Sequence, residues 1–164
     1  MIAFGPVPSR RLGLSLGINN IVSLKDCSYS CIYCQIGATR DKTITRKPSY
    51  EPGKLFEEVQ KHLEKLDVAH KPDYLTFVAN GDPTLDINLG EEIQMLKQLN
   101  IPIAIISNAS LINQEDVRTD LMNADWVSLK VDSVNEQVWR SINRPHPELN
   151  LKAILEGITC FAAV

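Results

Sequence analysis

The sequence predicts an α/β fold, a partial TIM-like parallel barrel with about four βα units. β-prone segments begin near residues 74, 101 and 126, a period of about 26 residues, and apolar stripes at helical spacing lie between them. The run Ile101–Ile106 is almost continuously apolar, as in a parallel strand that is covered on both faces. This regular alternation indicates one parallel sheet in a single domain over residues 1–164.

The first unit combines an early strand with a helix that begins at Pro52. We expect the strand over residues 14–21, followed by a long loop. Proline suits the first turn of a helix, because its missing N–H would have no partner there. One apolar stripe at spacings of four, four and three residues indicates the helix, and it consists of Leu55, Val59, Leu63 and Leu66.

The second and third units repeat the order of strand, polar turn and helix. The run 74–79 is β-prone and ends at the turn formers Gly81 and Pro83. The elements expected next are a helix around residues 93–99, a strand over 101–106 and a helix around 115–122.

The fourth unit begins with a strand over residues 126–131. Ser133 and Glu136 form a capping-box pattern, in which serine accepts from a free backbone amide and glutamate reaches back. We therefore expect Ser133 to begin a helix that runs to about Ile142. A last apolar stripe after Asn150 predicts another helix, on which Cys160 is expected to be buried as a small apolar residue.

Length and hydropathy predict a soluble protein. The chain has 164 residues, of which 44% are hydrophobic, and this suffices for a core without disulfide bonds. No apolar run approaches the roughly 20 residues that span a bilayer, and no charged leader precedes an apolar stretch at the N-terminus. We expect a cytoplasmic protein with no membrane segment.

Charge is distributed unevenly along the chain. Residues 1–50 carry seven Lys or Arg against two Asp, a net charge of +5, whereas the whole chain has −3. This basic excess surrounds the cysteines. It favours either steering of a phosphorylated or carboxylated ligand or a solvated loop over residues 40–47. The overall acidic balance argues against a general nucleic-acid binder and leaves a local RNA site open.

Three of the four cysteines lie within eight residues, namely Cys27, Cys31 and Cys34. Such clustering indicates a metal or cluster site, because a disulfide framework spreads its cysteines along the chain. A fourth ligand is missing nearby. A closed zinc site would need Cys160 or a histidine. An iron-sulfur cluster with one open iron would need only these three thiolates.

Polar residues follow the ends of the predicted strands. Because the carboxyl ends of parallel strands meet at one edge of the sheet, we expect these residues to converge beside the cysteine loop. They are Asn80, Gly81, Asp82, Pro83 and Thr84 after the second strand, Ser107 and Asn108 after the third, and Lys130 and Asp132 at the fourth.

The motif Cys27-x3-Cys31-x2-Cys34, with Tyr33 before the last cysteine, resembles the signature of the radical S-adenosylmethionine (radical SAM) superfamily. Segments 4–13, 81–85, 107–111 and 142–146 resemble a group of uncharacterised iron-sulfur oxidoreductases classed with wyosine-synthesis enzymes. The resemblance implies that the three cysteines ligate three irons of a 4Fe-4S cluster and that S-adenosylmethionine chelates the fourth. An electron from a flavodoxin- or ferredoxin-type reductant then yields a 5'-deoxyadenosyl radical that abstracts hydrogen from an unknown substrate.

The same resemblance implies cofactor-binding roles for the strand-end residues. Tyr33 corresponds to the aromatic whose backbone lies near the adenine. Residues 80–84 correspond to the segment that holds the methionine amino group, and Asp82 stands where the family usually has glutamate. Ser107 and Asn108 correspond to the position that faces the ribose or the methionine end, or they serve only as turn residues.

Three charged residues complete the implied site. Lys130 and Asp132 would contact the carboxylate and the ribose hydroxyls of S-adenosylmethionine, unless they form only a surface ion pair with each other. Arg144 would reach the methionine carboxylate, although a basic residue near a helix end also has a structural explanation.

The chain is short for this superfamily, whose usual core has six βα units. We expect the domain to be incomplete at its C-terminus and the last strand to be an exposed edge, which a second copy or a partner chain covers. Two alternatives to an enzyme follow. One is a non-catalytic fragment or partner-dependent module that binds an iron-sulfur cluster and S-adenosylmethionine. The other is a zinc-binding interaction domain.

Overall fold

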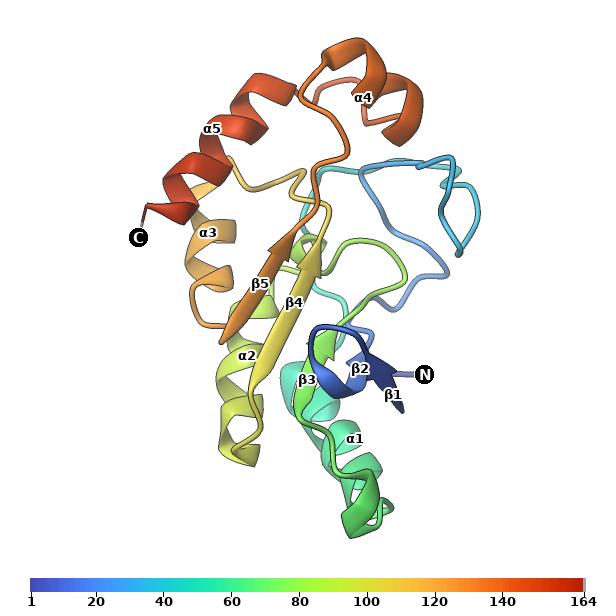
Figure 1. The fold of residues 1–164 in the computed structure, drawn as a ribbon, viewed down its shortest axis with the longest axis vertical. Helices are drawn as coiled ribbons and strands as arrows, with labels where there is room; N and C mark the ends of the chain where they lie inside the picture. The colour runs from blue at the N-terminus through green and yellow to red at the C-terminus, as the bar shows by residue number, and fades with distance from the viewer. Residues whose placement is uncertain (164) are drawn as a thin grey trace.

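A five-stranded sheet forms the centre of the computed structural model, which describes residues 1–163 (Figure 1). The strands lie in the order β1-β2-β3-β4-β5. β1 is antiparallel to β2, and each other neighbouring pair is parallel. The strands are β1 (Ala3–Ser9), β2 (Gly13–Ile18), β3 (Tyr74–Phe77), β4 (Ile103–Ser107) and β5 (Trp126–Leu129).

Helices follow each parallel strand except β2, whose helix comes after a long loop. The α-helices are α1 (Pro52–Glu64), α2 (Leu89–Leu96), α3 (Glu115–Leu121), α4 (Glu136–Asn143) and α5 (Leu151–Ala162). Short 3-10 turns are η1 (Val68–His70), η2 (Pro83–Leu85) and η3 (Lys97–Leu99). Within residues 1–163, no helix has the length and apolar character required to cross a membrane.

The predicted α/β fold is confirmed, and the sheet is open, with β2 to β5 parallel and β1 antiparallel. The four predicted parallel strands are β2 to β5, and β5 is the last strand of the sheet in the described residues. β1 was not predicted from the sequence. It contains Pro6 and Pro8, which lack the N–H that a strand needs, and prolines are tolerated there because β1 is an edge strand.

One face of the sheet carries the apolar core, and helices α1 to α3 lie on this side (Figure 1). Phe77 of β3 and Ile105 of β4 are completely buried. The predicted stripe of α1 supplies Leu55 and Val59, which are also completely buried. The helical periodicity in the sequence therefore identified the face of α1 that packs on the sheet.

Two local expectations are wrong. The N-cap of α4 is Asn135, whose side chain accepts from the Val138 amide at 3.1 Å, and Ser133 instead accepts from the Asn135 amide at 3.0 Å. Asn caps a helix as well as Ser does, and Asn135 directly precedes the first helical residue. Cys160 is exposed, because it lies away from the side of α5 that buries Leu151 and Ile154.

Residues 19–51, between β2 and α1, form neither a helix nor an extended strand. Two isolated bridges tie this segment to the turn after β3, one between Asp26 and Gly81 and one between Lys47 and Asp86. The long loop is thereby fixed at the carboxyl ends of the parallel strands, where the sequence predicts the site.

Candidate functional site

The cysteine loop, defined here as residues 25–47, contacts the turn after β3 through backbone hydrogen bonds. The Asp26 amide donates to the Asn80 carbonyl at 3.1 Å, and the Asp82 amide donates to the Asp26 carbonyl at 3.2 Å. Gly81 lies between these bonds with φ +150°, and an added Cβ would stand 1.5 Å from the Asp26 carbonyl oxygen. Only glycine permits this approach, so Gly81 is required for the position of the loop.

The thiols of Cys27, Cys31 and Cys34 are free, and each sulfur receives an N–H donor from outside the motif. Hydrogen bonds of this kind stabilise negative charge on sulfur and set the potentials of iron-sulfur sites. Asn108 Nδ2 donates to Cys27 Sγ at 3.5 Å, Asn143 Nδ2 to Cys31 Sγ at 3.3 Å, and Lys25 Nζ to Cys34 Sγ at 3.2 Å.

The cysteines differ in their electrostatic surroundings. Burial raises the pKa of the Cys27 thiol to about 12, and the Asp82 carboxylate acts in the same direction. Burial acts to raise the pKa of Cys34, but the hydrogen bond and the charge of Lys25, together with the backbone amides of Ile36 and Gly37, outweigh it, and the pKa is lowered. Ligation of iron would deprotonate all three thiols regardless of these differences.

The residues present fit an anionic cluster. Among residues 1–163, no three His, Cys, Asp or Glu side chains gather closely enough around one point to hold a single metal ion. Three free thiols, each with its own N–H donor, instead suit a larger group that is bound through several sulfurs. Asn143 Oδ1 is buried and has no hydrogen-bond partner, as expected of a polar atom beside a site for a bound group.

Asp82 is the polar centre of the strand-end region and is completely enclosed. Its carboxylate accepts from the Thr84 amide at 3.0 Å, the Thr84 hydroxyl at 2.5 Å, the Ser107 hydroxyl at 3.0 Å and the Asn108 amide at 2.6 Å. Burial raises its pKa although these bonds act to lower it. The carboxylate therefore joins the turn after β3 to the end of β4, and Asp82 is a positioning residue in this arrangement.

A second network joins the cysteine loop to the ends of β5 and α4. The Tyr33 hydroxyl donates to the Asp132 carboxylate, and Asn143 Nδ2 donates to the same carboxylate at 2.5 Å. Lys130 Nζ lies 3.9 Å from the Tyr33 ring centroid and 3.8 Å from Asp132 Oδ1. Burial acts to raise the pKa of Asp132, but the bonds from Tyr33 and Asn143 lower it.

The predicted site residues are thus brought to one edge of the sheet, with one exception. Arg144 ends α4 at φ 45° with an exposed side chain. Its carbonyl oxygen accepts from Lys42 Nζ at 3.1 Å and from the Ser30 amide at 3.3 Å. In the described residues, Arg144 therefore contributes to the site through its backbone.

Sequence reasoning missed three residues that shape the site: Lys25, Asn143 and Arg46. Asn143 lies in a segment that the resemblance covers, but its type alone gives no role. A solvated loop was one of the two alternatives for residues 40–47, yet the Arg46 side chain is only 7% exposed. It donates to the carbonyls of Thr84 and Asp86, both at 2.9 Å. The expectation of solvation is wrong for Arg46, because these carbonyls and two carboxylates surround it.

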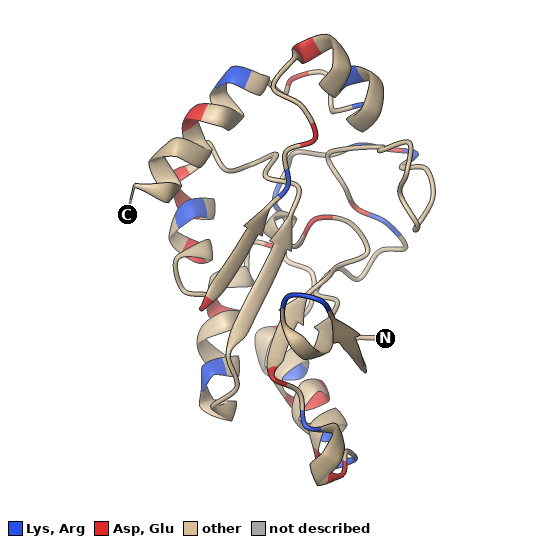
Figure 2. Ribbon diagram, viewed as in Figure 1, with Lys and Arg blue, Asp and Glu red and all other residues tan. Residues whose placement is uncertain are grey.

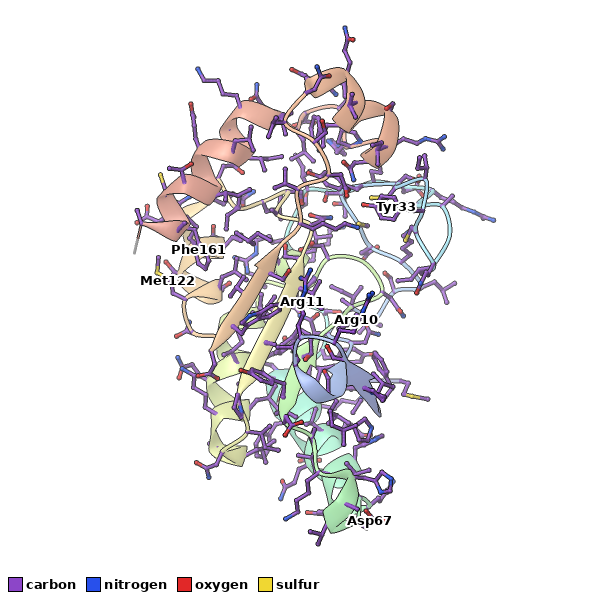
Figure 3. The ribbon with its side chains drawn as sticks, in the orientation of Figure 1. Arg10, Arg11, Tyr33, Asp67, Met122 and Phe161 are labelled. Carbon is purple, nitrogen blue, oxygen red and sulfur yellow. The ribbon has the colours of Figure 1, made fainter. Side chains whose placement is uncertain are left out.

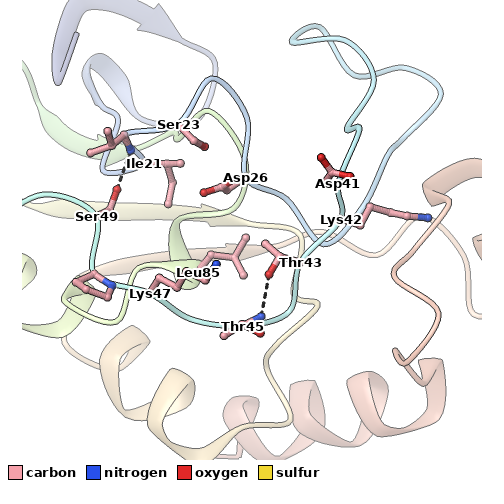
Figure 4. Close-up of a pocket in the computed structure, with 12 residues that line it drawn as sticks. Ile21, Ser23, Asp26, Asp41, Lys42, Thr43, Thr45, Lys47, Ser49 and Leu85 are labelled. Atoms are coloured by element: carbon pink, nitrogen blue, oxygen red, sulfur yellow. Dashed lines mark hydrogen bonds between the residues drawn. The ribbon is translucent and has the colours of Figure 1, made fainter.

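A cavity of about 460 Å³ lies between the cysteine loop and the turn after β3 (Figure 4). Asp26, Lys47, Ser49 and Leu85 are among the residues that line it. None of the three clustered cysteines does. Ser49 Oγ accepts from the Val22 amide at 2.7 Å beside it. This cavity is thus separate from the sulfurs.

Comparison with known proteins supports the family that the cysteine motif resembles. A family model described as the Radical SAM superfamily matches residues 21–159. A UPF0026 protein of Methanocaldococcus jannaschii is 60% identical over 160 residues, which make up 98% of this chain and 49% of that protein. The chain therefore spans about half the length of this relative.

Two solved structures share the fold. The structure of TYW1 with a lysine-pyruvate adduct bound matches with a TM-score of 0.62 and 19% identity, over 90% of this chain and 50% of that chain. Streptococcus suis SuiB bound to S-adenosylmethionine matches with a TM-score of 0.64 and 12% identity, over 90% of this chain and 31% of that chain. The family match covers most of the sequence, and the three-cysteine loop lies at the strand ends, so the chain belongs to the radical SAM superfamily.

Proposed function

We propose that the chain is the part of a radical SAM oxidoreductase that holds a 4Fe-4S cluster and S-adenosylmethionine. The observation that carries this proposal is the set of three free thiols at the carboxyl edge of the sheet, each with its own N–H donor. Donors of this kind come from a lysine and two asparagines on three separate segments. A chance group of buried thiols would not require such donors.

Cys27, Cys31 and Cys34 would hold the cluster. When bound, a cluster of this type supplies the electron that cleaves S-adenosylmethionine and so generates a 5'-deoxyadenosyl radical, which takes a hydrogen atom from the substrate. The protein residues orient the groups and tune charge. Lys25 would have the largest electrostatic effect of the three donors, because it alone carries a full positive charge.

S-adenosylmethionine would bind between the cysteine loop and the strand ends, as the resemblance implies. Residues 80–84 would meet the methionine amino group through backbone carbonyls, because the Asp82 carboxylate is already occupied by four donors. Ser107 is held by the same carboxylate, so its role would also be to position the turn. Asp132 remains the candidate for the ribose hydroxyls, and the predicted role of Lys130 at the S-adenosylmethionine carboxylate is replaced by one at the neighbouring hollow, which it lines.

The proposal also covers the cellular compartment, the electron donor and the partner of the protein. Free thiols in a clustered motif suit the reducing cytoplasm, where a flavodoxin or ferredoxin would supply the electron. β5 has an unpaired edge in the described residues. Since the chain spans about half of its relative, a further segment or a partner chain would cover that edge.

The test is anaerobic reconstitution of the chain with iron and sulfide, followed by dithionite reduction in the presence of S-adenosylmethionine. We expect about four irons and four sulfides per chain and release of 5'-deoxyadenosine. Cys31→Ala is the matched control and should lose both. Release no higher than that of the control would contradict the proposal.

A second candidate function is cofactor binding without turnover. The observation that favours it is the short length, because the chain covers only 49% of its relative. The same experiment separates the two functions. Cluster assembly and S-adenosylmethionine binding without release of 5'-deoxyadenosine would favour the binding module.

A further inference from the structure

A hollow of about 400 Å³ opens on the sheet face opposite the helices, beside the tip of the β1–β2 hairpin. The hairpin forms one wall, and the end of β4 together with β5 and the two residues after it forms the other. Its lining includes Ser9, Arg11 and Leu12 from the hairpin, and Ile106, Trp126 and Lys130 from β4, β5 and the residue after β5.

The floor of the hollow combines apolar side chains with a hydroxyl group. Ile106 is 41% exposed although it lies in a central strand, and it is paired in register with Ser128 of β5. Trp126, Ser128 and Lys130 alternate along the chain and so share one face of the sheet. This face therefore presents a partly apolar surface with a cation at its upper end.

The charge of the hollow is positive. Arg11 and Lys130 line it, and no carboxylate does. The acid nearest to Lys130 is Asp132 at 3.8 Å, and its other oxygen is occupied by Tyr33 and Asn143. Among the described residues, the Arg11 guanidinium forms no ion pair and no hydrogen bond. A guanidinium with five free donors that lines the same hollow as an ammonium group is suited to a doubly charged oxyanion.

The hairpin tip holds Arg11 in place over the sheet. Ser9 Oγ accepts from the Arg11 amide at 3.4 Å and from the Leu12 amide at 3.3 Å, and Leu12 is buried. At the base of the tip, Asp73 accepts from the Leu14 amide at 2.7 Å. Figure 3 shows Arg10 and Arg11 on this tip, with Arg11 in front of the sheet. The backbone that carries Arg11 is thus anchored on both sides of the turn.

Lys130 connects the hollow to the cysteine loop. Its ammonium lies over the Tyr33 ring, and Tyr33 precedes the last cysteine of the motif. A ligand that contacts both Arg11 and Lys130 would therefore end next to the proposed cofactor site. This is the place where a substrate would have to lie for hydrogen abstraction.

We propose that this hollow binds the phosphate group of the substrate, which is a small phosphate monoester, with Arg11 as its principal ligand. This inference rests on the proposed function, because it presupposes that the chain is part of an enzyme with a substrate. A phosphate monoester carries about −1.5 to −2 charges at neutral pH, which matches one guanidinium and one ammonium better than a single carboxylate would. Trp126 and Ile106 would contact the organic part of the ligand.

The test measures binding to the full metal-free chain at fixed ionic strength, by backbone amide shifts in NMR titrations. The probes are a nucleoside 5'-monophosphate, a sugar phosphate, the parent nucleoside and sugar, and succinate. We expect at least one monoester to shift the amides of residues 9–12 and 128–131, and its parent compound to bind at least tenfold more weakly. Arg11→Gln should weaken monoester binding at least tenfold.

Arg10→Gln is the matched control, because Arg10 lies on the same hairpin tip and does not line the hollow. It should change the affinity by less than about twofold. Equal losses of monoester affinity in the Arg10→Gln and Arg11→Gln variants would show a general electrostatic attraction of anions to the hairpin and would overturn the proposal. Succinate binding as tightly as the monoesters would overturn the phosphate class, and unshifted amides would overturn the site. Neither the cluster nor S-adenosylmethionine is needed, so failed 5'-deoxyadenosine release and failed phosphate binding are separate results.

Discussion

The helix-covered sheet and the cysteine loop are stabilised in different ways. Strands β2 to β5 contain no charged residue, as Figure 2 shows, and their buried side chains pack against α1, α2 and α3. The cysteine loop has no regular elements; it places Cys27 and Tyr29 in the core, and its other attachments are polar contacts with distant segments. Apolar packing is shared among many atoms, whereas each loop contact is separate. One substitution can therefore release the loop while the sheet stays folded.

Two anchors illustrate how the loop is held. Arg46 pairs with Asp116 at 2.6 Å and with Asp120, both on α3. On the other side, the Trp139 indole donates to the Tyr29 hydroxyl at 3.2 Å, and their rings meet edge to face with centroids 5.9 Å apart. The loop is thus fixed between α3 and α4, and Cys31 and Cys34 lie between the two anchor residues, Tyr29 and Arg46, in the chain.

The largest effect is expected from a cavity in the sheet core. Phe77→Ala should lower the free energy of unfolding by about 3–5 kcal/mol, because Phe77 is completely buried against the helices. Chemical denaturation measures this value. Val78→Ala, on the opposite face and 41% exposed, is the control and should cost less than about 1 kcal/mol. Similar losses in both variants would contradict the placement of the core.

A smaller and more local effect is expected from the loop anchor. Arg46→Met should cost about 2–3 kcal/mol, since it leaves the Asp120 carboxylate and two backbone carbonyls without their donor. Limited proteolysis should cut within residues 35–47 faster than in the wild type while the sheet remains protected. Lys61→Met removes an exposed pair with Glu57 and should cost less than about 0.5 kcal/mol. Uniform proteolysis of the Arg46 variant would argue against a separately anchored loop.

The next effect concerns the connection between the turn after β3 and β4. Asp82→Asn would place an amide N–H group among the four donors that now point at the carboxylate, and should cost about 2 kcal/mol. Hydrogen exchange should accelerate at the Thr84 and Asn108 amides more than at Ile105. Asp67→Asn, at an exposed position, is the control. Unchanged exchange at both amides would show that Asp82 does not join these segments.

The last effect is a pH dependence that arises from Glu92 on α2. Burial raises the pKa of Glu92 to about 8, and Asp86 nearby adds to this. An unfolded glutamate has a pKa of about 4.3, so between these values the folded chain holds a proton that the unfolded chain has lost. Stability should therefore fall as the pH rises from about 4.3 to 8 and then level off. Thermal melts of Glu92→Gln should show a flatter profile, and those of Glu91→Gln, at the exposed neighbouring position, should follow the wild type.

The regular part of the molecule was predictable because its signals are local. Leu55 and Val59 mark a helix face by their spacing alone, and the run at β4 marks a parallel strand. The expectation that both faces of this strand are covered is wrong at Ile106, which is 41% exposed. Capping is a weaker signal: Ser133 and Asn135 are both good caps, and the sequence did not distinguish them. β1 was missed because its prolines argue against a strand until its edge position is known.

The sequence by itself determined that three thiols lie close together on one loop, since the spacing of Cys27, Cys31 and Cys34 follows from covalent connectivity. It also determined which strand ends meet, because parallel strands share an edge. Only the tertiary structure decided that Asp82 faces inward, that Arg46 is buried, and that Lys25 and Asn143 reach the sulfurs. These contacts join residues up to 112 positions apart and follow no periodic pattern, so only the folded chain brings them together.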